Sequence, residues 1–263
     1  MSANRPETLT VAPSPRSERL VGTSDDLDDL RVGLDALSGL AMGRLSLTDT
    51  LTAVATFAVQ AVPGADGAGL TLREDERADV VVATSSFVAE VDAVQREFGQ
   101  GPCLTALTEG RVVRSGSLGN DEEWRRFGSK VARMGVHSVL ALPLQTAEGA
   151  VGVLDVYAHA KHAFDERAAH LGRLFAVPAS IAVQNARELA RATRSVEQLE
   201  RALEERGSLE RAVGILMSRS GCTREEGLER LRQLSQDQHA KLTTVADSIV
   251  DEAVRRARAR RSP

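Results

Sequence analysis

Cysteine, lysine and aromatic residues are all scarce in this chain of 263 residues. Its cysteines are Cys103 and Cys222, without a CxxC pair, which excludes a structural zinc site of the usual kind and indicates a reducing compartment. Of 33 basic residues, lysines are found at positions 130, 161 and 241 alone, a bias typical of a high-GC bacterium. The few aromatic residues offer no evident platform for stacking unpaired bases, so the cores must be built from aliphatic side chains.

Several functional signatures are missing as well. No apolar run approaches 18 residues and no signal-peptide pattern is present, so we expect a soluble, cytoplasmic protein without membrane contact. The phosphate-binding, zinc-protease, hydrolase and kinase motifs do not occur, which disfavours an enzyme and predicts no catalytic residues. His159 and His162 flank a turn without matching carboxylate or thiol spacing, so no metal site is predicted.

Charge is distributed unevenly along the chain. The formal net charge is −4, whereas residues 205–263 carry 12 basic and 9 acidic side chains, a net charge of +3. The basic tail, residues 255–263, adds a dense arginine cluster that would attract any polyanion without sequence preference. The C-terminal part is therefore the plausible site for a polyanionic partner.

Residues 207–254 contain three short helical patterns in which apolar positions repeat at steps of three and four. Gly221-Cys222 ends the first pattern, and Thr223 with Glu226 forms a capping box that begins the second. Each helix is too short to be stable alone, so the three must pack on one another.

This order of residues resembles the ANTAR domain, the three-helix RNA-binding module of bacterial transcription antiterminators. The matching positions span nearly the whole module and are Ala212, Gly214–Met217, Gly221-Cys222, Glu226, Leu231-Arg232, Ser235, Lys241-Leu242 and Val245-Ala246. The sequence departs from the family at Val213, where lysine is usual, and at His239-Ala240, where an Asn-Arg pair is usual.

The candidate RNA-binding residues lie in this module. Helix-borne arginine and lysine can bind phosphates or stack on splayed loop bases, and a glycine would let a backbone approach the first helix closely. The candidates are Arg211, Gly214, Arg219, Arg224, Arg232 and Lys241.

The middle of the chain, residues 45–183, alternates helical and strand patterns. Helices are expected at about 48–61 and 87–98, and a further short helix is expected to end at 109. Strands are expected at 69–72, 79–83, 112–114, 138–144 and 150–157, and the last two, long and apolar, suit central antiparallel strands.

This block resembles a GAF domain. The resemblance rests on Gly99-x-Gly-Pro-Cys103, the Trp124 loop, the run from Gly135 to Leu144, and Gly152-Val153-Leu154. It implies an α+β fold, an antiparallel sheet flanked by helices, and a small-molecule sensor, although domains of this class also serve only in dimerisation. The cofactor or ligand stays unknown.

Two residues are candidates for the sensor pocket. Cys103 is either a reactive thiol, with a pKa lowered by its position at a helix start, or a small buried residue. Asp155 interrupts an apolar strand, where its carboxylate either contacts a ligand or points to solvent at an edge.

The segments outside these domains complete the organisation. We expect a disordered lead over residues 1–23 and a helix over 24–44 whose heptad seam serves dimerisation or lies on its own domain. Residues 184–206 belong to a long helix in which Leu189, Ala192, Val196, Leu199 and Leu203 keep heptad spacing. This spacing predicts a parallel two-stranded coiled coil, and thus a homodimer, that loosens before Gly207.

Together these features predict a cytoplasmic regulator of actinobacterial type that binds stem-loops in nascent mRNA and prevents a terminator from forming, under the control of a GAF sensor. Two alternatives stay open. One is a DNA-binding helix-turn-helix regulator, and the other is a sensor or interaction protein with weakened RNA binding, suggested by Val213 and Ala240.

Overall fold

The computed structural model describes residues 18–40, 45–73 and 80–259. The chain divides into two compact units, and the boundary between them falls between Ala190 and Arg191. Most of the lead that we predicted to be disordered lies outside the described residues. Helix α1 spans Glu18–Leu40, so it begins before the start that we expected at Ser24.

The first unit is built on a five-stranded antiparallel sheet with the order β2-β1-β5-β4-β3. Its strands are β1 (Gly67–Leu72), β2 (Val80–Ala83), β3 (Val113–Ser115), β4 (Ser138–Thr146) and β5 (Gly149–Ala158). The two long apolar runs form neighbouring strands, and β5 is central. Both faces of these strands are covered, which explains why their sequences are almost continuously apolar.

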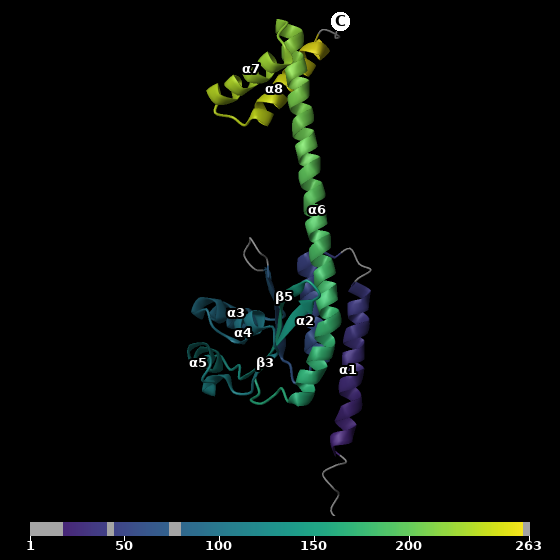
Figure 1. Ribbon diagram of the computed structural model, residues 1–263, viewed down its shortest axis with the longest axis vertical. Coiled ribbons are helices and arrows are strands. Elements are labelled where there is room, and N and C mark those ends of the chain that lie inside the picture. The colour runs from purple at the N-terminus through teal and green to yellow at the C-terminus, as the bar shows by residue number, and fades with distance from the viewer. Residues whose placement is uncertain (1–17, 41–44, 74–79, 260–263) are drawn as a thin grey trace, which may run out of the picture. The chain divides into compact units, whose positions relative to one another are not determined.

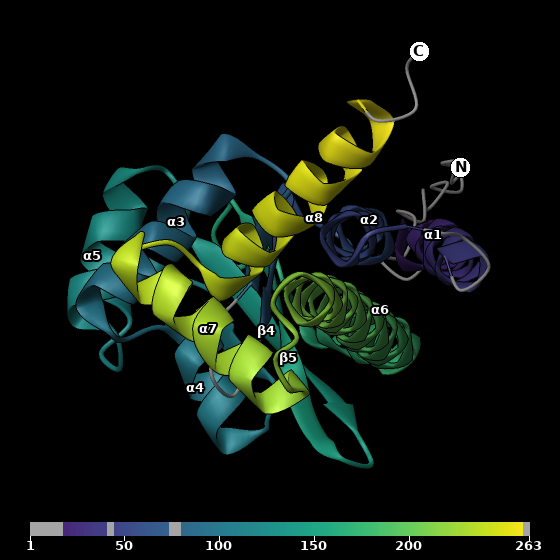
Figure 2. The ribbon, with the colours of Figure 1, turned by 90° about the horizontal axis from the view of Figure 1, so that it is seen from above.

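Helix α2 (Leu47–Ala61) and the first part of α6 (Glu166–Ser220) cover one face of the sheet, and α1 packs on their outer side (Figures 1 and 2). Leu30 and Leu37 of α1 are buried in this core, so the apolar seam of α1 packs on its own domain. An ion pair of 2.9 Å between Arg167 and Asp26 also joins α6 to α1.

The opposite face of the sheet carries α3 (Ser86–Phe98), α4 (Pro102–Glu109), the 3₁₀ turn η1 (Leu118–Asn120) and α5 (Arg125–Arg133), as Figure 2 shows. Successive strand residues point to opposite faces. Val153 and Tyr157 of β5 therefore lie in this second core. Asp155, between them, is the residue whose chemistry does not match that core.

Helix α6 is a single helix of 55 residues. The coiled-coil seam is predicted to loosen before Gly207, whereas the helix backbone continues through this residue. One glycine weakens a helix by only about 1 kcal/mol, and the turns on either side supply good helix formers. The helix ends at Gly221, which has a φ of +68° and donates its N–H to the Met217 carbonyl at 2.8 Å. The first predicted helix of the C-terminal module is therefore the last part of α6.

The second unit packs this end of α6 against α7 (Arg224–Asp237) and α8 (Leu242–Ala259). Its core consists of Ala212, Val213, Leu231, Val245 and Ala246. The predicted capping box is present in both directions: the Thr223 hydroxyl accepts from the Glu226 N–H at 3.2 Å, and the Glu226 carboxylate accepts from the Thr223 N–H at 2.8 Å. The predicted α+β sensor domain, helical linker and all-α module are thereby confirmed as the fold.

Candidate functional site

The six candidate RNA-binding residues all lie on the surface of the second unit. Arg211, Gly214 and Arg219 are on α6, Arg224 and Arg232 are on α7, and Lys241 immediately precedes α8. An added Cβ at Gly214 would meet no heavy atom within 4 Å, so this glycine leaves a stretch of backbone open to a partner.

Three of the candidate arginines form ion pairs. Arg219 pairs with Glu252 at 3.8 Å, Arg224 with Glu210 at 2.5 Å, and Arg232 with Glu229 at 3.4 Å. The hydrogen bond and charge of Arg224 lower the pKa of Glu210. Because exposed ion pairs contribute little to stability, these guanidinium groups can exchange a carboxylate for a phosphate at small cost.

Arg211 and Lys241 form no ion pair with any of the described residues. Arg211 lines a groove of about 620 Å³ together with Thr243 of α8, two residues after Lys241. The groove is of mixed charge, since Glu204, Glu205 and Asp247 also line it.

A second group of cations lies further along α8. Arg219 pairs with Glu252, which also forms an ion pair with Arg256. Arg255 and Arg258 are exposed on the same helix. The cations of the module therefore lie along α6, α7 and α8 and are not gathered into one pocket, as expected for a surface that follows a phosphate backbone.

Of the two family departures, Val213 is not a surface position, whereas His239 of the second is exposed. Val213 is 4% exposed and belongs to the core, with its Cγ1 3.2 Å from where a Cβ on Gly227 would lie. Ala240 is partly buried, and its carbonyl accepts a 2.6 Å hydrogen bond from the Ser235 hydroxyl. Valine at 213 thus contributes to packing, and a lysine there would have to extend its ammonium group out of the core.

The two sensor-pocket candidates are brought together in the first unit. Cys103 of α4 and Asp155 of β5 are 2% and 1% exposed, and their side chains hydrogen-bond to each other. The alternative in which Asp155 points to solvent is wrong, because β5 is central and covered on both faces. Burial raises the pKa of the Cys103 thiol, with the Asp155 charge adding to the effect, so the expected lowering is also wrong.

Sequence reasoning missed two members of this cluster, Asp92 of α3 and Tyr157 of β5. Asp92 is 5% exposed, and its Oδ1 accepts a 2.9 Å hydrogen bond from the Tyr157 hydroxyl. Burial raises the pKa of Asp92 to about 6. The available signal was its position one residue after Val91 on the apolar face of α3, where a charged residue is unexpected.

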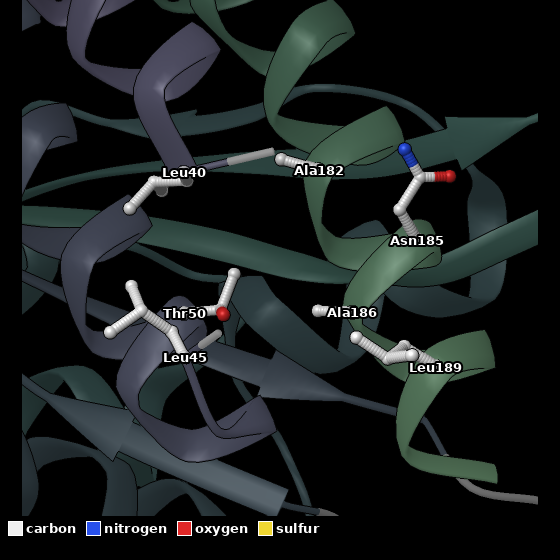
Figure 3. A pocket seen from close by; sticks show the side chains of 7 residues that line it. All are labelled: Leu40, Leu45, Thr50, Ala182, Asn185, Ala186 and Leu189. Atoms are coloured by element: carbon white, nitrogen blue, oxygen red, sulfur yellow. The ribbon is translucent and has the colours of Figure 1, made fainter. Parts of the chain in front are cut away.

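The first unit also has an apolar surface along α6. A small groove between α6, the end of α1 and the start of α2 is lined by Leu40, Leu45, Thr50, Ala182, Asn185, Ala186 and Leu189 (Figure 3). Leu189 is 59% exposed beside it, and Leu174, Val177 and Ile181 are exposed on the same helix. In the second unit, Val196, Leu199 and Leu203 are similarly exposed. Exposed apolar rows of this extent mark interaction surfaces.

Two kinds of feature were not found in the described ranges. They contain no group of three or more histidine, cysteine, aspartate or glutamate side chains that could hold a metal ion. Among the helices described, none is sufficiently long and apolar to cross a membrane.

Comparisons with known proteins agree with this division. Residues 44–184 match the family model of the GAF domain, and residues 197–250 match that of the ANTAR domain. No match was found among curated proteins.

Solved structures similar to the first unit include two GAF domains from phosphoenolpyruvate-protein phosphotransferases. The one from Coxiella burnetii is 15% identical, with 64% of this chain and 98% of that chain covered and a TM-score of 0.48. The one from Acinetobacter is 15% identical, with 63% and 97% covered and a TM-score of 0.45. A third is an enzyme, the free methionine-R-sulfoxide reductase of Neisseria meningitidis, at 17% identity, 69% and 98% coverage and a TM-score of 0.42.

Proposed function

Because the chain belongs to the GAF domain family and carries an ANTAR domain after its sensor domain, we propose that it is an antitermination regulator that binds stem-loops in nascent mRNA. GAF domains are sensors and ANTAR domains are RNA-binding modules, so the roles proposed for the two units are regulatory and not catalytic. Nascent transcripts place this activity in the cytoplasm.

The observation that carries the proposal is the surface of the ANTAR module. Among the residues that the structure describes, Arg211 and Lys241 have no ion-pair partner, and three further arginines are held by exposed ion pairs. Gly214 leaves backbone accessible between them. This arrangement suits an RNA loop, whose splayed bases and bent backbone need both cations and close approach.

Dimerisation is part of the same proposal. The exposed Val196, Leu199 and Leu203 keep heptad spacing, and a parallel coiled coil would bury them. A dimer would hold two modules close together, so that paired stem-loops bind more tightly through effective concentration without a new contact. The groove and the exposed apolar residues of the first unit would extend the interface.

A DNA-binding helix-turn-helix function is less well supported. Helix α8, the third helix of the module, carries the acidic residues Asp247, Asp251 and Glu252, which would face the phosphates of a major groove unfavourably. Weakened RNA binding is likewise not favoured by Val213, since this position is buried.

Binding assays on hairpin RNA and duplex DNA separate these functions. The full chain is titrated at equal concentration and moderate salt against a pool of hairpin RNAs and against duplex DNA of the same length. Preference for hairpin RNA, weakened by Arg211→Ala and Lys241→Ala but not by Arg125→Ala in the sensor domain, supports the proposal. Equal or stronger binding to duplex DNA would refute it.

A further inference from the structure

A buried acidic cluster lies between the sheet and helices α3 and α4. It consists of Asp92, Cys103, Asp155 and Tyr157, which come from α3, α4 and β5 and are at most 5% exposed. Gly69 of β1 pairs directly with Asp155 across the sheet. A Cβ on Gly69 would lie 2.7 Å from Oδ2 of Asp92, so the two carboxyl groups are neighbours above the same point of the sheet.

Each carboxyl group in this cluster keeps one oxygen without a partner. Tyr157 donates to Oδ1 of Asp92, and Oδ2 has no hydrogen-bond partner. The Cys103 thiol is hydrogen-bonded to the Asp155 carboxyl, whose Oδ1 also has no partner. Leaving buried acceptors unpaired costs free energy, which apolar residues of similar shape would avoid.

The protein itself supplies little positive charge to these oxygens. The nearest cation, Arg96 of α3, donates through Nε to the backbone carbonyl of Asp92 at 3.3 Å, although its charge does lower the pKa of the Asp92 carboxyl. The other groups that face the cluster are neutral: Thr71 of β1 and Ala141 of β4, together with Gln95, whose Oε1 accepts from the Cys103 N–H at 3.1 Å.

We propose that the unpartnered oxygens of Asp92 and Asp155 form the sensor site for a small monovalent cation with N–H donors, an ammonium or primary alkylammonium ion. This proposal rests on the sensor function proposed above and names the ligand class of that site. Both unpartnered oxygens can accept hydrogen bonds, so a ligand that bears N–H groups would satisfy them. Because the site is buried, a ligand whose positive charge neutralises the cluster is favoured.

The charge of the cluster matches one positive charge. Burial and the neighbouring Asp92 raise the pKa of Asp155 well above its usual range. Asp92, with a pKa of about 6, is mostly ionised at neutral pH. Because the pKa of both carboxyl groups is raised and the charge of Asp92 opposes ionisation of Asp155, the cluster resists carrying two negative charges and fits a monovalent cation better than a divalent one. Ligand contacts to both groups would tie α3 to β5.

Calorimetric titration of the full chain with methylammonium chloride tests the proposal. Tetramethylammonium chloride, which has the same charge but no N–H, and potassium chloride are titrated at matched ionic strength. We expect saturable binding of methylammonium alone. Its affinity should be about tenfold weaker at pH 5 than at pH 7, because protons compete for Asp92. Absence of saturable binding, or equal binding of potassium, would overturn the proposal.

Matched variants locate the site. Asp92→Asn and Asp155→Asn keep the shape of the side chains and should weaken methylammonium binding at least about tenfold, the loss of one charged hydrogen bond. Glu97→Gln, an exposed change on α3, should leave it unchanged. Wild-type affinity in Asp92→Asn would contradict the assignment. If a variant does not fold, the comparison of the three salts on the wild-type chain still shows whether the protein binds an ion with N–H donors selectively. Binding of hairpin RNA by the full chain, measured without any amine present, tests the proposed RNA function separately.

Discussion

The Tyr157 hydroxyl donates a 2.9 Å hydrogen bond to the Asp92 carboxyl and thereby connects the central strand β5 to helix α3. This bond lowers the pKa of Asp92, but desolvation raises it more, to about 6. Burying the carboxyl group therefore makes the stability of the sensor domain depend on pH in the opposite sense from an ordinary surface aspartate.

Replacement of Asp92 by asparagine should stabilise the sensor domain above pH 6. Because the folded pKa is raised from 3.8 to about 6, the native state binds this proton more tightly, and wild-type stability falls as pH rises across that window. Asp92→Asn lacks this loss, so we expect an advantage of about 1–3 kcal/mol at pH 7 that vanishes near pH 4. Urea unfolding followed by the fluorescence of buried Trp124 measures it.

The control for this experiment is Glu97→Gln on the same helix. Its unfolding curve should stay parallel to that of the wild type at every pH, because the side chain is exposed. A constant difference between Asp92→Asn and the wild type from pH 4 to pH 7 would show that Asp92 does not titrate as described.

Removal of the Thr223 cap should loosen the ANTAR module. Thr223→Ala deletes the acceptor of the Glu226 N–H and should destabilise α7 by about 1 kcal/mol. Hydrogen exchange of the α7 amides, followed by mass spectrometry, should speed up, whereas Thr244→Ala at an exposed position of α8 should have a much smaller effect. Equal exchange rates in the two variants would argue against the cap.

Substitution of Gly214 should separate stability from RNA binding. Gly214→Ala adds a methyl group in open space within α6 and should stabilise the helix by up to about 1 kcal/mol. If RNA approaches this backbone, hairpin affinity should fall at the same time. Ser195→Ala, at an exposed position of the same helix outside the candidate surface, should stabilise the helix without loss of affinity. Unchanged affinity in Gly214→Ala would remove this residue from the interface.

The coiled coil is tested by one charge on its seam. Leu199→Glu should convert the dimer to a monomer in sedimentation experiments, since it places an unpaired carboxylate in the apolar interface. Gln198→Glu adds the same charge at the neighbouring exposed position and should leave the dimer intact. A wild-type chain that sediments as a monomer would contradict the coiled-coil interface.

Much of the fold could be predicted from the sequence because local signals agreed with the packing. Each of three local patterns favours one kind of element. The capping box at Thr223 predicts a helix start, and the apolar segments of β1, β4 and β5 predict strands. The continuity of α6 through Gly207 is not evident from the sequence, because Arg206 and Glu210 interrupt the heptad seam there. A helix backbone nevertheless tolerates a single glycine.

The buried cluster was only half predicted. Asp155 and Cys103 stood out within apolar or glycine-rich segments, but nothing in the sequence shows that Asp92, far away along the chain, lies above Gly69. That proximity depends on the register of β1 against β5 and on the placement of α3, both of which are tertiary. Val213 lies on the apolar face that the helical pattern predicts, so its burial agrees with that pattern. The family pattern, with lysine at this position, does not show which face of the helix the position occupies.

Crosslinking and sequencing of RNA bound to the full chain in its native host identifies the transcripts that the protein binds. Reads from the wild type should concentrate on stem-loops upstream of terminators. An Arg211→Ala/Lys241→Ala double variant, present at equal abundance, should lose most of this enrichment. Reads that are no more enriched on such stem-loops than those from the double variant would contradict the proposed RNA function.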